Sequence, residues 1–204
     1  NLDTSVGTES NINRPHYFLF MEVLTETELR MRFDEIVDKI KNGAVFIHPT
    51  DTIYGLGCNA LDEKAVEKIR DIKKRPEAPL SVWVHSKEWI IENCGNHKWL
   101  DELPGPYTLI MPLTNKKSVT PSVVKGKETL GVRLPNHWFS KVVAKLGFPI
   151  VTTSANKTGE PFMTKLENLD PNVEKEVSFM IYEGEKEARP SKLVNVEKEE
   201  VKER

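Results

Sequence analysis

The spacing of apolar and polar residues along the chain predicts a helix close to the first residues with a clear pattern. A capping box formed by Thr25 and Glu28 precedes apolar residues that recur at helical intervals. These apolar residues are Leu29, Phe33, Ile36, Val37 and Ile40. Gly43 follows the last of them and is suited to end the helix.

Short apolar runs, several of them β-branched, predict seven strands farther along the chain. They cover residues 44–48, 80–84, 107–113, 130–134, 150–153, 179–182 and 193–196. Two more helices are expected between strands, one capped by Asp62 and one capped by Asn136 and closed by Gly147. Residues 115–129 are expected to form a polar, basic surface loop. This mixture predicts one layered α/β or α+β domain with a central sheet.

Composition changes this picture little. The 204 residues are 38% hydrophobic and 29% charged, which is typical of one globular domain, and the net charge of −2 gives no argument for nucleic acid or an anionic membrane. No apolar run of about 18 residues occurs, so neither a transmembrane helix nor membrane association is expected. Cys58 and Cys94 are expected to be packing residues in a reducing, cytoplasmic setting.

Met21 stands directly before the first helix signal and is a candidate natural start. Residues 1–20 would then be an N-terminal extension that need not be native, and residues 21–204 would form the domain. No repeat period and no long linker divides the rest of the chain.

Polar residues concentrate in four segments at or beside predicted strand ends, where open sheets bind ligands. The segments are 49–55, 73–76, 131–135 and 152–156. Each also has a purely structural interpretation: a turn for the first and last, a helix end for the second, and a salt bridge for the third. Alternatively, the three adjacent cations Lys73, Lys74 and Arg75 could clamp phosphate. Arg133 could bind a carboxylate. No Walker A, GxGxxG, GxSxG or metal-ligand motif is present, so a nucleotide would need a non-standard pocket.

Taken in order, these segments resemble the motifs of the Sua5/YrdC/YciO family. The matching motifs are Pro49-Thr50-Asp51-Thr52-Ile53-Tyr54-Gly55-Leu56, Lys73-x-Arg75-Pro76, Pro104-Gly105-Pro106-x-Thr108, Val132-Arg133-x-Pro135 and Ser154-Ala155-Asn156-x-x-Gly159. The resemblance covers roughly residues 22–204 and implies a YrdC/RibB-like twisted mixed sheet, flanked by helices around a deep basic cavity. Ala78, Trp83 and Lys192 depart from the family's usual pattern.

The resemblance is specifically to the short, single-domain threonylcarbamoyl-AMP synthases, and so implies a nucleotidyltransferase. Such an enzyme forms threonylcarbamoyl-AMP and pyrophosphate from L-threonine, bicarbonate or CO2, and ATP, for the t6A modification of tRNA. A separate tRNA threonylcarbamoyltransferase complex would use the product, and direct contact with tRNA or RNA stays open. Mg2+ would be held mainly by the ATP phosphates. The alternatives are an RNA-binding or YciO-like member with little synthase activity, or a carbamoyl-adenylate-forming relative.

The resemblance also implies roles for individual residues. The catalytic pair would be Lys73 and Arg75. Contacts to threonine would come from Thr52, Tyr54, Arg133, Ser154 and Ser191. Contacts to ATP would come from Lys73, Arg75, Thr129, Asn156, Thr164 and Arg204.

Overall fold

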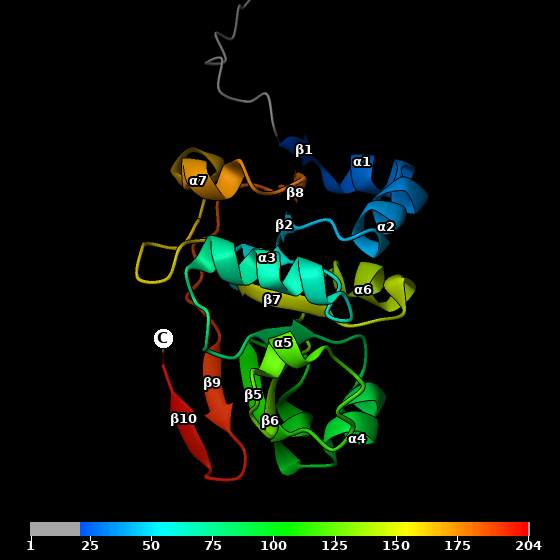
Figure 1. Cartoon of the computed structure of the whole chain (residues 1–204), viewed down its shortest axis with the longest axis vertical. Coiled ribbons are helices and arrows are strands. Elements are labelled where there is room, and N and C mark those ends of the chain that lie inside the picture. The colour runs from blue at the N-terminus through cyan, green and yellow to red at the C-terminus, as the bar shows by residue number, and fades with distance from the viewer. Residues whose placement is uncertain (1–20, 204) are drawn as a thin grey trace, which may run out of the picture.

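A computed structural model describes residues 21–203, and the strands within them form one mixed sheet. The strands are β1 (Glu22–Leu24), β2 (Phe46–His48), β3 (Gly55–Gly57), β4 (Ser81–Trp83), β5 (Tyr107–Pro112), β6 (Thr129–Arg133), β7 (Ile150–Ser154), β8 (Phe179–Ile181), β9 (Lys192–Asn195) and β10 (Glu200–Lys202). Their order across the sheet is β1-β8-β2-β3-β7-β4-β6-β5-β9-β10. Figure 1 shows β9 and β10 side by side at the C-terminal end of the chain.

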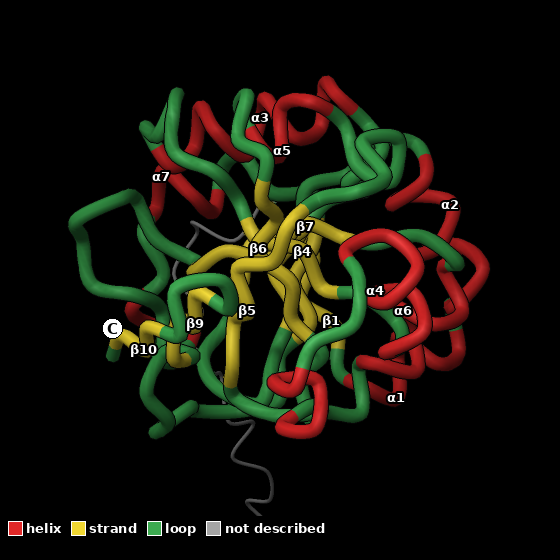
Figure 2. The backbone as a smooth tube through the Cα atoms, turned by 90° about the horizontal axis from the view of Figure 1, so that it is seen from below, coloured by secondary structure: helices red, strands yellow, loops and turns green. Residues whose placement is uncertain are grey.

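Helices lie around this sheet, with the strands at the centre of the molecule (Figure 2). They are α1 (Glu26–Met31), α2 (Phe33–Lys41), α3 (Glu63–Lys73), α4 (Lys87–Cys94), α5 (Pro121–Val124), α6 (Ser140–Leu146) and α7 (Pro171–Glu174), with 3-10 turns η1 (Lys98–Glu102) and η2 (Leu166–Asn168). None of the helices in the described range combines the length and the apolar character needed to cross a bilayer. The predicted mixed α/β architecture is confirmed.

The seven predicted strands are all present, with ends shifted by at most two residues. The Thr25–Glu28 capping box is also confirmed, but the helix behind it is divided into α1 and α2 at Arg32. Apolar spacing continues across this break, so the pattern could not predict it. β1, β3 and β10 were not predicted, and β3 is built from Gly55, Leu56 and Gly57, a composition with low strand propensity.

Two local predictions were wrong. Asn136 does not cap the third helix, because α6 begins at Ser140 with Phe139 as its N-cap, and the amide of Asn136 donates instead to Asp51 Oδ2 at 3.0 Å. The expected surface loop 115–129 contains the short helix α5, whose residues 122–124 are buried. Apolar positions there are too few for a helical repeat to be visible in the sequence.

The apolar side chains form two core clusters. The larger includes the inner faces of α3 and α5, while the smaller joins α1, α2 and α6 to the aromatic residues Phe46, Trp83 and Phe179. Both cysteines are free and buried in the larger cluster. Burial raises the pKa of the Cys94 thiol to about 12 and that of the Cys58 thiol well above its usual range, so both are packing residues, as predicted.

Strand β7 is the seam of the sheet, because it pairs antiparallel with β3 on one side and with β4 on the other. The register places Gly55 opposite Ser154, and Ser81 opposite both Thr152 and Gly131. All of these side chains are small. A Cβ added to Gly131 would lie only 2.6 Å from Ser81 Oγ, so the glycine permits the close approach of β4 and β6. The small side chains therefore leave space above the middle of this sheet face.

Candidate active site

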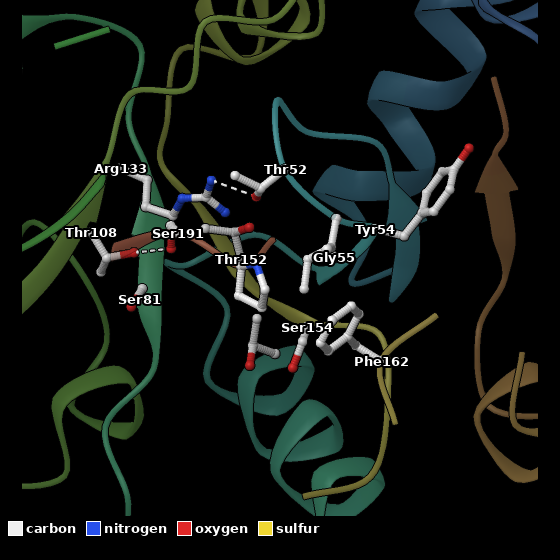
Figure 3. A pocket seen from close by; sticks show the side chains of 13 residues that line it. Thr52, Tyr54, Gly55, Ser81, Thr108, Arg133, Thr152, Ser154, Phe162 and Ser191 are labelled. Carbon is white, nitrogen blue, oxygen red and sulfur yellow. Dashed lines mark hydrogen bonds between the residues drawn. The ribbon is translucent and has the colours of Figure 1, made fainter. Parts of the chain in front are cut away.

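A cavity of about 230 Å³ lies over the small residues at the seam (Figure 3). Its volume suits a small polar metabolite rather than an entire nucleotide. Its walls come from segments far apart in the sequence: the 52–55 turn, strands β4 to β7, and two later segments. The side chains that Figure 3 labels around it are Thr52, Tyr54, Gly55, Ser81, Thr108, Arg133, Thr152, Ser154, Phe162 and Ser191.

Arg133, at the end of β6, brings a nearly buried guanidinium to one wall of the cavity. Its Nη2 donates to Asp51 Oδ1 at 3.0 Å and to Thr52 Oγ1 at 3.2 Å. Asp51 is itself fixed, because its second carboxylate oxygen accepts the Asn136 amide. The structural salt bridge and the anion-binding role are therefore compatible: Asp51 orients a cation that still lines the cavity and can bind a carboxylate.

Hydroxyl groups surround the space beside Arg133. Thr108 on β5 and Ser191, just before β9, share a hydrogen bond of 2.7 Å. Thr152 Oγ1 is buried and has no hydrogen-bond partner within residues 21–203, although its residue lines the cavity. Such groups can orient a small polar ligand without adding charge.

Lys73 does not line the cavity, but it brings a second cation next to it by bonding Ser154, which does. It is the last residue of α3, and its Nζ donates to the carbonyl of Ser154 at 2.7 Å, to Ser154 Oγ at 3.2 Å and to Asn156 Oδ1 at 2.7 Å. Burial, with a smaller contribution from the charge of Arg75, lowers the pKa of Lys73 to about 7. Lys73 of the predicted phosphate clamp is thus joined to the Ser154-Ala155-Asn156 segment by direct hydrogen bonds.

Arg75 and Tyr54 lie differently from what their predicted roles suggest. Arg75 sits half-buried in the turn after α3 and does not line the cavity. Tyr54 lines it, but its hydroxyl points away from it (Figure 3), donating to the Gly184 carbonyl at 2.6 Å and accepting from the Glu183 amide at 3.1 Å. Tyr54 therefore anchors the segment that leads to Ser191.

Glu183 strengthens that anchor. Its carboxylate accepts from His137 Nε2 at 2.9 Å, from Trp138 Nε1 at 2.6 Å and from Lys186 Nζ. Burial opposes the ionisation of Glu183, but these hydrogen bonds prevail and lower its pKa to about 2. Glu183, in the segment that leads to the lining residue Ser191, is thus bonded to His137 and Trp138 in the turn before α6.

Thr129, Asn156 and Thr164, three further predicted ATP contacts, do not line the cavity. Thr129 begins β6 four residues before Arg133 and lies on the same strand face, farther along. The hydroxyl of Thr164 accepts from Asn168 Nδ2 at 2.9 Å. Arg204 lies outside the described residues.

Some lining residues were not among the predicted site residues. Ser81 is a small polar residue at the start of an apolar strand, and Phe162 is an aromatic residue in a polar loop. Neither signal is specific enough to mark a site. Trp83 is fully buried and packs edge-on against His48, with ring centroids 5.5 Å apart, and burial lowers the pKa of His48 to about 3. Neither ring lines the cavity.

No group of three or more His, Cys, Asp or Glu side chains in the described part of the chain could hold a metal ion.

The comparison with known families decides the assignment. The family profile Sua5/YciO/YrdC, described as telomere recombination, matches residues 38–203. The chain belongs to the Sua5/YciO/YrdC family. The match covers every segment that lines the cavity.

Individual relatives agree with this membership. A Methanocaldococcus jannaschii protein, provisionally named a threonylcarbamoyl-AMP synthase, is 35% identical over 186 residues, covering 87% of this chain and 86% of that one. The Haemophilus influenzae threonylcarbamoyl-AMP synthase is 36% identical over 143 residues, covering 64% of this chain and 76% of the relative.

Solved structures of the family share the fold. The Pyrococcus abyssi Sua5 structure in complex with L-threonine superposes with a TM-score of 0.75 at 28% identity, covering 87% of this chain. This chain spans about half of that protein, 54% of its length. The Escherichia coli YciO structure has a TM-score of 0.74 at 23% identity, covering 86% of this chain and 89% of its own, a likeness of fold alone.

Proposed function

We propose that this chain is an L-threonylcarbamoyladenylate synthase, a nucleotidyltransferase that forms threonylcarbamoyl-AMP and pyrophosphate from L-threonine, bicarbonate or CO2, and ATP. The observation that carries the proposal is the placement of two cations at one cavity of about 230 Å³: Arg133, oriented by Asp51, lines it, and Lys73 lies behind the lining residue Ser154, to which it is bonded. The names of the relatives and the threonine complex of the P. abyssi protein support it.

L-threonine would bind at the Arg133 wall. The guanidinium would hold the carboxylate, while Thr52, Thr152 and Ser191 would contact the polar groups of the amino acid. Its amino group would then face the cavity, where it can condense with bicarbonate to give a carbamate and water. Orientation by several hydrogen bonds would convert an unfavourable encounter into a reaction within one complex.

ATP would bind with its phosphates at the Lys73 side. A carbamate oxygen would attack the α-phosphorus, and pyrophosphate would leave, so no protein nucleophile is needed. Lys73 and Arg75 would stabilise the charge that develops on the phosphate oxygens. Thr129, Asn156, Thr164 and Arg204 remain proposed nucleotide contacts. Mg2+ would arrive with ATP and supply further charge neutralisation, with phosphate oxygens as its main ligands.

The product would serve the t6A modification of tRNA, carried out by a separate tRNA threonylcarbamoyltransferase complex. Threonylcarbamoyl-AMP is a mixed anhydride and a reactive acyl donor, so it needs such an acceptor system close by.

The proposal is tested by incubating the protein with threonine, bicarbonate, Mg2+ and ATP, followed by mass spectrometry for the adenylate and an assay of pyrophosphate. Arg75→Ala should abolish formation of both products, because a cation beside the phosphates is lost. Arg30→Ala is a suitable control, since Arg30 lies on α1 in an exposed pair with Glu26. Pyrophosphate release that does not require threonine would contradict the proposed reaction.

A further inference from the structure

Arg70 is a buried arginine that the reaction scheme above does not use. It lies on α3, one turn before Lys73, and is only 2% exposed. Within the described residues, its guanidinium donates hydrogen bonds to main-chain carbonyls rather than to carboxylates. The acceptors are the carbonyls of Arg75, Pro76, Ala78, Ser122 and Val123.

These bonds hold a segment that has no regular secondary structure of its own. Residues 75–79 form no helix or strand, and Pro76 and Pro79 have no amide to donate. The carbonyls of this turn, which lie in part-buried contacts, nevertheless need donors. Arg70 Nη1 supplies them, at 3.1 Å from the Arg75 oxygen, 3.3 Å from the Pro76 oxygen and 2.7 Å from the Ala78 oxygen.

The same guanidinium ties this turn to α5. Nε donates to the Ser122 carbonyl at 2.8 Å and Nη2 to the Val123 carbonyl at 3.2 Å. An arginine can serve both sides because its planar fork carries five N–H donors in fixed directions, which a lysine cannot reproduce. The turn, α3 and α5 therefore share one donor group.

We propose that Arg70 is a positioning residue for ATP: it fixes the 75–78 turn so that Arg75 is presented beside Lys73, where the phosphates would lie. This rests on the proposed function, in which Lys73 and Arg75 hold the phosphates. The positive charges are close enough to influence one another, since the charge of Arg75 contributes to lowering the pKa values of both Arg70 and Lys73, after burial. A bound polyphosphate would relieve that repulsion.

The test measures ATP affinity by calorimetry without threonine or bicarbonate, together with hydrogen exchange of the amides in residues 75–80. Arg70→Lys keeps the charge and removes the fork. Arg32→Lys is the matched control, because Arg32 also uses its fork, binding Glu22 and Glu35, but lies between α1 and α2. Pro76→Gly loosens the same turn from its exposed side and leaves the buried guanidinium in place.

We expect Arg70→Lys to speed exchange in residues 75–80 and to weaken ATP binding roughly tenfold, the equivalent of one charge-assisted hydrogen bond. Pro76→Gly should shift both quantities in the same direction, and it carries the test if Arg70→Lys does not fold. Threonine affinity should be unchanged in both variants, and Arg32→Lys should behave as the wild type. Faster exchange with unchanged ATP affinity would overturn the proposal, because the order of the turn would then not matter to phosphate binding.

The two proposals fail separately, because the affinity is measured without turnover. A protein that binds ATP through this turn but forms no adenylate would contradict the synthase assignment and leave the role of Arg70 standing. If the wild type forms the adenylate but Arg70→Lys binds ATP with normal affinity, the synthase assignment stands and the proposed role of Arg70 is contradicted.

Discussion

The lowered pKa of Lys73 predicts that ATP affinity depends on pH in a defined direction. In the free protein, burial and the neighbouring Arg75 hold this pKa at about 7, so Lys73 loses its proton as the pH rises through neutrality. Bound phosphates favour the charged lysine and raise its pKa. Binding therefore takes up a proton above pH 7 and takes up almost none well below it, so affinity should fall as the pH rises.

The size of the effect follows from one titrating group. With a pKa of about 7, the charged fraction of Lys73 falls from about nine-tenths at pH 6 to about one-tenth at pH 8. If only the charged form binds well, the dissociation constant should increase about tenfold between these two values.

Calorimetry provides the assay, since titrations in two buffers of different ionisation enthalpy also give the number of protons taken up. Lys73→Arg is the control, because arginine stays charged throughout this range. The protonation of ATP itself and its binding of Mg2+ depend on pH in the same way for both proteins. The difference between the two affinity profiles therefore reports the titration of Lys73. An equal pH dependence for the wild type and Lys73→Arg would refute the reasoning.

Two further predictions concern stability. Gly131→Ala places a Cβ 2.6 Å from Ser81 Oγ and should cost about 1–3 kcal/mol in denaturant unfolding; Gly131→Ala combined with Ser81→Gly should recover most of that loss, and no recovery would show that the contact is elsewhere. His48 has a folded pKa of about 3 against about 6.5 unfolded, so the unfolded chain binds more protons between these values and stability falls as the pH drops below 6.5. The loss should reach about 2 kcal/mol at pH 5, and thermal or denaturant unfolding of His48→Gln should show a flatter profile over this range.

The strands and the chemically distinctive segments were predictable because their signals are local. Apolar runs mark buried strands wherever they pair. Arg133 stands out within an apolar strand, and Lys73 begins a run of three cations before a proline. Strand β3 escaped prediction because Gly55 and Gly57 have low strand propensity, and its place beside β7 follows from tertiary pairing alone.

The partners of the site residues were less predictable. Asp51 orients Arg133 across 82 positions of sequence, and that contact depends on how the 49–55 turn meets the end of β6. Arg70 looks like an ordinary helix-end cation, since its acceptors are main-chain oxygens and carbonyls have no sequence signature. The direction of the Tyr54 hydroxyl is likewise fixed by a distant loop, at Gly184.

The position of β7 at the seam has a consequence for how the protein responds to its own substrates. Thr52 precedes the strands on one side of β7, while Arg133 belongs to the strands on the other, so a molecule that touches both acts as a removable cross-link between the two parts of the sheet. A ligand at one hundred times its dissociation constant contributes about 2.7 kcal/mol to the free energy of unfolding. Such a ligand would add to the core packing and the Arg133–Asp51 bond that already join the two parts, so the supply of threonine and ATP would regulate the lifetime of the enzyme as well as its rate.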